Sequence, residues 1–170
     1  NLVASPLTLR DATAADLPRI VAIYNDSIPG RLATADVDPV TVEQRRAWFE
    51  RHSPERRPLW VAENDDGIAG WLSFESFYGR PAYDATVELS VYVAHVHQRR
   101  GVGDRLLRSA LERAPALGVG TALGFIFAHN EPSLALFRRH GFAEWGRYPD
   151  IAVLDGVERT LAVLGRKIGK

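Results

Sequence analysis

The sequence predicts a single α/β domain, of the α+β type, in which four helices flank one mixed sheet of about seven strands. Strand-like and helix-like apolar spacing alternate in the order β-αα-βββ-α-β-α-ββ, which is neither a regular βαβ series nor separate blocks. Two turn sequences, Asn64-Asp65-Asp66-Gly67 and Asp155-Gly156, predict hairpins, so part of the sheet is antiparallel. Residues 1–170 contain no repeat and no linker, which indicates one domain.

The first third of the chain is predicted to form one strand and two helices. Residues 7–10 form a short strand. A helix follows, because apolar residues recur at helical spacing at Leu17, Ile20, Val21 and Tyr24. Residues 28–40, with two prolines, form an irregular connection, and Thr41 with Gln44 makes the capping-box start of a second helix.

The rest of the chain supplies the remaining strands and helices. Strands are predicted over 59–63, 68–77, 85–93, 121–128, 146–154 and 157–165. One helix covers 101–114, where the apolar residues share a face, and another covers about 131–139 and ends at Gly141.

Composition and charge exclude several classes of partner. The 21 basic residues balance the 21 acidic ones, so no overall field attracts nucleic acid or a membrane surface. No stretch approaches the ~20 apolar residues of a membrane span. The absence of cysteine excludes disulfides and thiolate chemistry, and the five histidines show no metal-ligand spacing. We therefore expect a cytoplasmic protein with no metal, nucleic-acid or membrane partner.

The strand 86–93 carries a carboxylate on its polar face. With a period of two, one face presents Val87, Leu89, Val91 and Val93 to the core, and the other presents Thr86, Glu88, Ser90 and Tyr92. Taken alone, Glu88 is explained by an exposed charge on the wet side of a sheet. Because the strand runs directly into a glycine-rich loop, a place in a cleft is the alternative.

That loop has the components of an anion site, in the residues Arg99, Arg100, Gly101, Val102, Gly103 and Asp104. A helix beginning at Arg100 or Gly101 would aim unpaired N–H groups and the positive end of its dipole at the loop. Glycines let a bulky anion approach the backbone, which suits a pyrophosphate. The spacing is that of neither a Rossmann nor a Walker loop. A glycine-rich turn with solvated arginines is the alternative.

Strand, Q-x-x-G-x-G loop and helix together resemble motif A of the GNAT acyltransferase superfamily. The segment AHNEPSLALFRRHGF (128–142) resembles its second cofactor segment, N-x-x-S-x-x-x-F/Y-x-x-x-G-F. The resemblance implies the GNAT fold, with a mostly antiparallel mixed sheet, and acetyl-CoA as co-substrate. It places the pyrophosphate at residues 99–104 and the pantetheine amides against Val91, Tyr92 and Val93. It also implies a side-chain contact from Asn130, which a helix N-cap explains equally well.

A narrower resemblance implies the activity. The segments GRPAYDATVELSVYV (79–93) and VAIYNDSI (21–28) are similar to the phosphinothricin and methionine sulfoximine acetyltransferase branch, whose members acetylate the α-amino group of small amino-acid-like compounds. The resemblance implies a homodimer, with Glu88 as the general base through water or with a raised pKa. Many superfamily members have a Tyr where this chain has Phe137, so the proton for the departing thiolate would come from Tyr92 or Tyr148, or from no residue.

The substrate pocket is expected to lie in the loops around Glu88. Arg80 could pair with a carboxylate or phosphinate, with Tyr78 and Tyr83 as walls, and residues 28–40 should shape the same pocket. A protein N-terminal or lysine acetyltransferase is one alternative, which needs an open groove. A non-catalytic acyl-CoA-binding sensor is another, which Phe137 favours and Glu88 disfavours.

Overall fold

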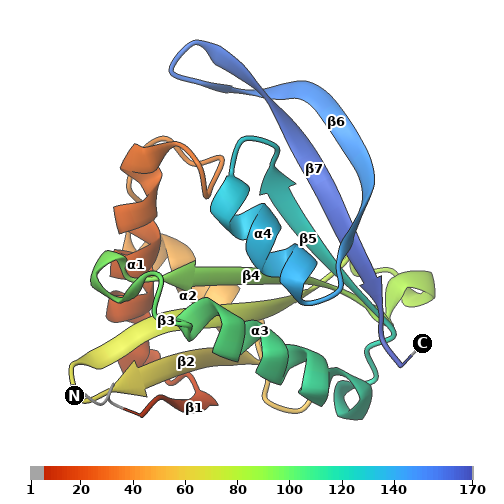
Figure 1. The fold of residues 1–170 in the computed structure, drawn as a ribbon. Coiled ribbons are helices and arrows are strands. Elements are labelled where there is room, and N and C mark those ends of the chain that lie inside the picture. The colour runs from red at the N-terminus through yellow and green to blue at the C-terminus, as the bar shows by residue number, and fades with distance from the viewer. Residues whose placement is uncertain (1–5, 170) are drawn as a thin grey trace.

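Seven strands form one sheet in the order β1-β2-β3-β4-β5-β7-β6 in the computed structural model, which describes residues 6–169 (Figure 1). The elements are β1 Thr8–Asp11, α1 Leu17–Ser27, α2 Val42–Glu50, β2 Leu59–Asn64, β3 Gly67–Ser76, β4 Thr86–Val93, α3 Val102–Arg113, β5 Thr121–Phe127, α4 Glu131–Arg139, β6 Ala143–Leu154 and β7 Val157–Lys167. Every neighbouring pair is antiparallel except β4 and β5, which are parallel. The predicted element order and sheet type are confirmed.

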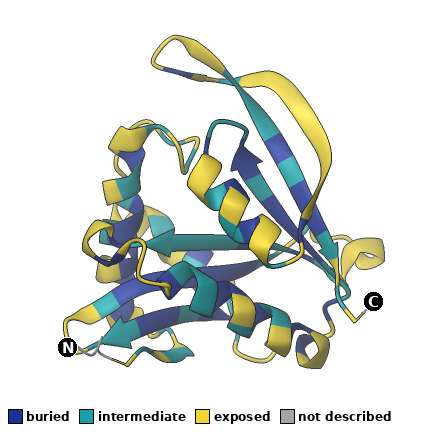
Figure 2. Cartoon of the chain, viewed as in Figure 1, coloured by how far each residue is buried: buried dark blue, intermediate teal, exposed yellow. Residues whose placement is uncertain are grey.

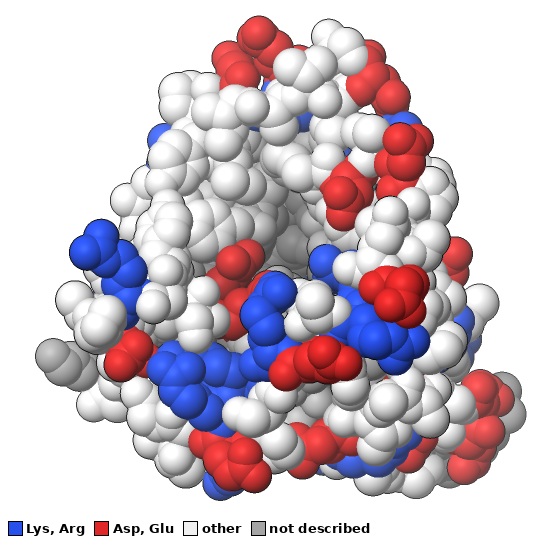
Figure 3. All heavy atoms as spheres, turned by 180° about the vertical axis from the view of Figure 1, so that it is seen from behind, with Lys and Arg blue, Asp and Glu red and all other residues white. Residues whose placement is uncertain are grey.

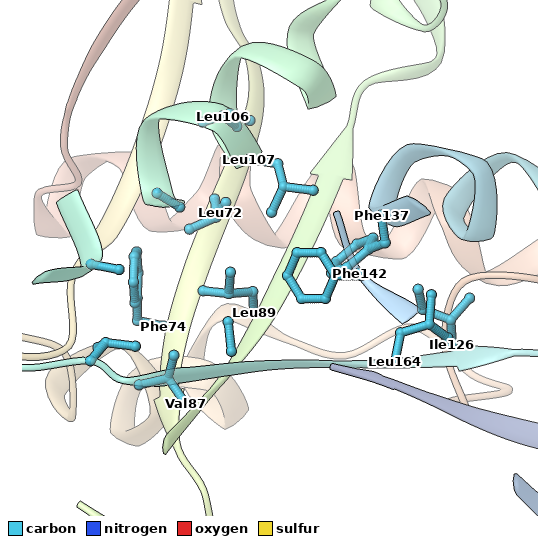
Figure 4. Close-up of a cluster of buried hydrophobic side chains, with 14 of the residues drawn as sticks. Leu72, Phe74, Val87, Leu89, Leu106, Leu107, Ile126, Phe137, Phe142 and Leu164 are labelled. Atoms are coloured by element: carbon cyan, nitrogen blue, oxygen red, sulfur yellow. The ribbon is translucent and has the colours of Figure 1, made fainter. Parts of the chain in front are cut away.

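Helices cover both faces of the sheet, α3 and α4 on one and α1 and α2 on the other (Figure 1). The α3–α4 side buries a cluster that includes Leu72, Phe74, Val87, Leu89, Leu106, Leu107, Phe137 and Leu164 (Figure 4). The opposite side buries Ile20, Tyr24, Trp48 and Trp71. Buried residues accordingly concentrate on the sheet and on the inner faces of the helices (Figure 2). No described helix is long and apolar enough to cross a membrane.

Local signals explain where two elements begin or turn. At the start of α2, the Gln44 amide donates to Thr41 Oγ1 at 3.1 Å and the Thr41 amide donates to Gln44 Oε1 at 2.8 Å, which confirms the predicted capping box. Asp155 and Gly156 join β6 to β7 with φ of 53° and 78°. Positive φ at both positions is typical of the two-residue hairpin turn that the Asp-Gly pair predicts.

Predicted boundaries differ from the observed ones by up to three residues, and two of the differences have a structural reason. The third helix begins at Val102, after Arg100 and Gly101, because Gly101 is its N-cap in a left-handed conformation at φ 81°. Strand β6 begins at Ala143 rather than at residue 146, and its register with β7 shifts twice. Gly165 of β7 leaves room there for Trp145, because a Cβ at Gly165 would lie 2.1 Å from the indole ring.

Strands β4 and β5 pair over a short length and then diverge, as Figure 1 shows. Their register joins Thr86–Glu88 to Thr121–Leu123 and ends there. Helix α4 packs close to β5 because Gly124 has no side chain, since a Cβ there would lie 2.6 Å from Cε1 of Phe137. The divergence begins at Glu88, so the fold places this carboxylate where the sheet opens.

Candidate active site

A cleft of about 410 Å³ occupies the space where β4 and β5 diverge. Its walls come from β4, β5, α4, the β6–β7 hairpin and the loop after α1, through Leu32, Ala33, Thr34, Ala35, Glu88, Leu89, Ser90, Val91, Tyr92, Phe125, Ile126, Phe127, Asn130, Ser133, Phe137, Ile151, Ala152 and Leu161. Among these lining residues Glu88 is the only Asp, Glu, Lys, Arg or His. A space-filling view from behind shows a hollow near the middle of the molecule, with largely uncharged walls above it (Figure 3).

Glu88 is half-buried at the last position where β4 pairs with β5. Burial, and then the negative charge of Glu75 on the neighbouring strand, raises the pKa of Glu88 to about 7. Both causes disfavour the ionised form, so the carboxylate binds a proton more strongly than a solvated one does. The alternative of an exposed charge on the wet side of the sheet is therefore wrong for Glu88. A carboxylate with such a pKa can accept a proton near neutral pH.

The two faces of β4 are both covered. Val87 and Leu89 are buried in the core below α3, as the period of two predicts. On the other face, Tyr92 stacks on Trp71 with ring centroids 4.7 Å apart, and its hydroxyl donates to the carbonyl oxygen of Ala33 at 3.0 Å. Beyond Glu88 the edge of β4 toward β5 has no strand partner among residues 6–169. This edge includes Val91, Tyr92 and Val93, whose outward backbone groups are therefore free of sheet pairing on that side.

The glycine-rich loop lies immediately before α3. Arg99, Arg100 and Gly101 are exposed, and Gly103 packs beside α4, since a Cβ there would lie 3.2 Å from Cδ2 of Leu136. The first N–H groups of α3 therefore point toward an exposed, basic turn. The Asp104 carboxylate bonds to Arg139 at 3.1 Å and to His140 at 2.9 Å, so it joins α3 to the end of α4.

Asn130 is buried in the cleft wall and uses both ends of its side-chain amide. Its Oδ1 accepts the Ser133 amide at 3.3 Å, which confirms the helix N-cap, and its Nδ2 donates to the carbonyl oxygen of Leu32 at 3.2 Å. In this arrangement Asn130 holds the loop after α1 against α4.

The loop after α1 forms one wall of the cleft, as expected for residues 28–40. Besides Tyr92 and Asn130, His129 Nε2 makes a 2.8 Å hydrogen bond with the Arg31 carbonyl. The Arg31 side chain in turn pairs with Asp155 at the β6–β7 turn, at 2.9 Å. The loop is therefore attached to β4, to α4 and to the hairpin, which surround the cleft.

The three residues expected to contact substrate lie in the β3–β4 loop, outside the set that lines the cleft. Arg80 is exposed, and 75% of Tyr78 and 43% of Tyr83 are accessible. The two tyrosines are connected to the cleft by aromatic contacts through Phe77. The ring centroid of Phe77 lies 4.4 Å from that of Tyr78, 5.3 Å from that of Tyr83 and 6.4 Å from that of Phe125. Phe125 itself lines the cleft.

Sequence reasoning missed several residues near Glu88. Phe125, Ser133 and Ile151 line the cleft from segments that only the tertiary fold brings together. Glu75 was also missed, although the sequence contains its signal. Glu75 lies on β3, the strand that precedes β4 in the chain, at the position that pairs directly with Glu88.

Comparisons with known proteins show the family. Residues 17–142 match the Acetyltransferase (GNAT) family. The Bacillus subtilis protein YwnH is 52% identical over 163 residues, which cover 95% of this chain and 99% of YwnH. The L-methionine sulfoximine/L-methionine sulfone acetyltransferase of Pseudomonas aeruginosa is 36% identical over 145 residues, 85% of this chain and 84% of that protein.

A solved structure extends the comparison to the cofactor. The GNAT superfamily phosphinothricin acetyltransferase of Sinorhizobium meliloti, in complex with acetyl-CoA, has a TM-score of 0.90 and 30% identity, and the match covers 96% of this chain and 89% of that one. Family, fold and relatives lead to one conclusion. The chain belongs to the GNAT acetyltransferase family, as an N-acetyltransferase of the phosphinothricin and methionine sulfoximine acetyltransferase branch.

Proposed function

We propose that this enzyme transfers the acetyl group of acetyl-CoA to the α-amino group of a small amino acid or analogue, of the phosphinothricin or methionine sulfoximine kind, with Glu88 as general base. The observation that carries the proposal is that Glu88 is the only Asp, Glu, Lys, Arg or His among the described residues that line the cleft. An amine attacks a thioester only as the free base, so its ammonium form must first lose a proton. Glu88 takes that proton directly or through one water.

The residues around the cleft suit acetyl-CoA as the acyl donor. The N-terminus of α3, with Gly101 as an unobstructed N-cap and Arg99 and Arg100 beside it, would hold the pyrophosphate. The free edge of β4 over Val91–Val93 would pair with the pantetheine amides, and an N–H of this segment would stabilise the oxyanion. A bound acetyl-CoA supplies the activated acyl group. Asn130 would contact it once the bond to Leu32 is released.

The departing thiolate has one candidate proton donor in the cleft. Phe137 has no proton to give, and Tyr148 is not among the described residues that line the cleft. Tyr92 lines it and has a hydroxyl proton, but burial raises the pKa of this hydroxyl and makes it a weaker acid than a solvated phenol. Departure of the thiolate without a proton is the alternative.

A thiol-release assay tests the function. Purified enzyme with acetyl-CoA is offered phosphinothricin, methionine sulfoximine, the common amino acids, and peptides with a free N-terminus or lysine. We expect turnover with the small amino-acid analogues. Turnover with peptides alone would establish a protein acetyltransferase, and acetyl-CoA binding without turnover on any amine would establish an acyl-CoA sensor.

Arg80 is proposed to bind the acidic group of the substrate, with Tyr78 and Tyr83 beside it. Replacing Arg80 with Ala should raise the KM for phosphinothricin roughly tenfold or more, since a charge-assisted hydrogen bond contributes about 1.5–3 kcal/mol. The value of kcat should change little, because the contact is the same in ground and transition states. Arg108→Ala on the exposed face of α3 is the control. An unchanged KM would place recognition of the acid elsewhere.

We also propose a homodimer. Strand β6 is the last strand of the sheet and exposes apolar side chains, among them Tyr148, Ile151 and Val153 at 47%, 59% and 62%. Exposed apolar side chains gathered on an edge strand suit an interface between two copies of the chain. Sedimentation velocity should give twice the mass of the chain, and Val153→Lys should reduce it. A monomeric parent protein would contradict the proposal.

A further inference from the structure

A second carboxylate lies directly beside Glu88 on the same face of the sheet. The register of β3 and β4 pairs Glu75 with Glu88 and Ser73 with Ser90. Directly opposed residues of an antiparallel pair have Cβ atoms about 5 Å apart, and two like charges so placed repel each other. Both carboxylates can be ionised together only at a cost, so the surroundings decide which of them keeps the charge.

The surroundings of the two carboxylates differ. Glu75 forms an ion pair with Arg51, which follows α2, at 3.7 Å, and 31% of its side chain is exposed. Glu88 forms no ion pair within the described part of the chain, and the cleft that it faces is otherwise uncharged. Of the two carboxylates, Glu75 is therefore the one with a positively charged neighbour.

Two other titratable groups near the pair, His52 and Tyr92, are neutral at pH 7. His52 Nδ1 faces the carbonyl of Trp48 at 2.9 Å, so Nδ1 carries the proton and Nε2 accepts the Ser73 hydroxyl at 2.7 Å. Burial lowers the pKa of His52, and burial raises that of Tyr92. Strand β5 places Leu123 opposite Glu88.

Among the described residues, the other walls of the cleft add no charged neighbour to Glu88. Helix α4, the β6–β7 hairpin and the loop over 32–35 contribute no Asp, Glu, Lys, Arg or His to the described lining of the cleft. Among the described residues, Glu75 is thus the charge that acts on Glu88 from the elements packed around it, and Arg51 acts through its ion pair with Glu75.

We propose that Glu75 is a positioning residue for acetyl transfer: its carboxylate, opposite Glu88 across the β3–β4 pair, makes Glu88 a stronger base, and Arg51 offsets part of this effect. The inference rests on the proposed role of Glu88. When Glu88 accepts the proton, an N–H bond of the substrate ammonium breaks and an O–H bond forms on the carboxyl group. The combined charge of the two side chains then falls from −2 to −1, which relieves their repulsion. Glu88 returns the proton to water after the product leaves.

The test is the pH profile of kcat in charge-changing variants of the ion pair. In Glu75→Gln the acidic limb should move to lower pH by roughly one unit, which raises the fraction of ionised Glu88 at pH 6 about fivefold. The plateau at high pH should fall, because a weaker base accepts the proton less readily. In Arg51→Gln the limb should move the other way, since a positive charge is lost.

A surface carboxylate provides the matched control. Glu50→Gln removes the same charge from an exposed position at the end of α2, and its limb should stay in place. Opposite shifts in Glu75→Gln and Arg51→Gln are a readout that a purely structural role would not produce. If Glu75→Gln fails to fold, the shift in Arg51→Gln decides alone, and an unmoved limb in the folded variants overturns the proposal.

A direct titration separates this inference from the proposed function. In protein labelled with ¹³C at the glutamate carboxyl groups, the signal that Glu88→Gln removes belongs to Glu88. Its pKa should lie near 7 in the parent and lower in Glu75→Gln. Full turnover in Glu88→Gln would contradict the base role even if this shift is seen. An unshifted Glu88 signal with inactive Glu88→Gln would overturn only the role of Glu75.

Discussion

Replacing Glu88 with Gln is expected to lower kcat by about 10²-fold or more and to leave the affinity for acetyl-CoA unchanged. The amide has nearly the size of the carboxyl group but cannot accept the ammonium proton. The cofactor contacts proposed here lie at the N-terminus of α3 and on the free edge of β4, and neither uses the Glu88 side chain. The loss should therefore appear in turnover rather than in binding.

The pH dependence of the parent enzyme supports the same test. Because the pKa of Glu88 is raised to about 7, the fraction of ionised base grows between pH 6 and pH 8, and kcat should rise over that interval. Steady-state kinetics measures both effects, and titration calorimetry measures acetyl-CoA binding. Glu50→Gln serves as the control for an ordinary loss of charge. Parent-like turnover in Glu88→Gln would remove Glu88 as the base.

The second large effect is expected at the loop before α3, where Gly101→Val should weaken acetyl-CoA binding roughly tenfold or more. Gly101 has φ of 81°, a conformation that costs a branched residue about 1–2 kcal/mol. Nothing lies within 4 Å of a Cβ built there, so the new side chain would project into the open space before the helix. There it would obstruct a pyrophosphate approaching the N–H groups of α3.

Two variants separate this obstruction from strain and from charge. Gly118→Val introduces the same strain at φ of 73°, with nothing within 4 Å, after the helix rather than before it, so acetyl-CoA binding should be unaffected. Arg99→Ala removes a charge without changing the glycines, and its loss of affinity should be smaller. Calorimetric titration with acetyl-CoA compares the three. Equal losses in Arg99→Ala and Gly101→Val would show that charge, rather than backbone access, dominates binding.

Much of the fold could be predicted because local signals determine the elements. Period-two spacing, the Thr41–Gln44 capping box and the Asp155-Gly156 turn depend on neighbouring residues, and the structure confirms all three features. The start of α3 was misjudged because a left-handed glycine can lie inside or before a helix, and spacing alone does not distinguish the two. Strand β6 was shortened because its register shifts hide the period of two.

The site could be predicted only in part. The alternating strand predicts the polar-face position of Glu88 and the family resemblance implies its role as base, but its pKa depends on burial and on Glu75, which lies across a strand pair. The bonds of Asn130 to Leu32 and of Tyr92 to Ala33 join residues far apart in the chain. These contacts carry no spacing signal, because nothing in either segment specifies the other.

The sequence by itself determined the order of elements, the position of Glu88 on a strand and the glycine-rich turn before a helix. Each of these follows from periodicity or backbone preference within a few residues. The tertiary structure decided that β4 and β5 diverge at Glu88 and that the loop after α1 forms one wall of the cleft. It also decided that Glu75 lies opposite the base and that Arg51 forms an ion pair with Glu75. The reason is electrostatic as well as geometric: the proton affinity of a carboxylate depends on burial and on charges that folding brings near it.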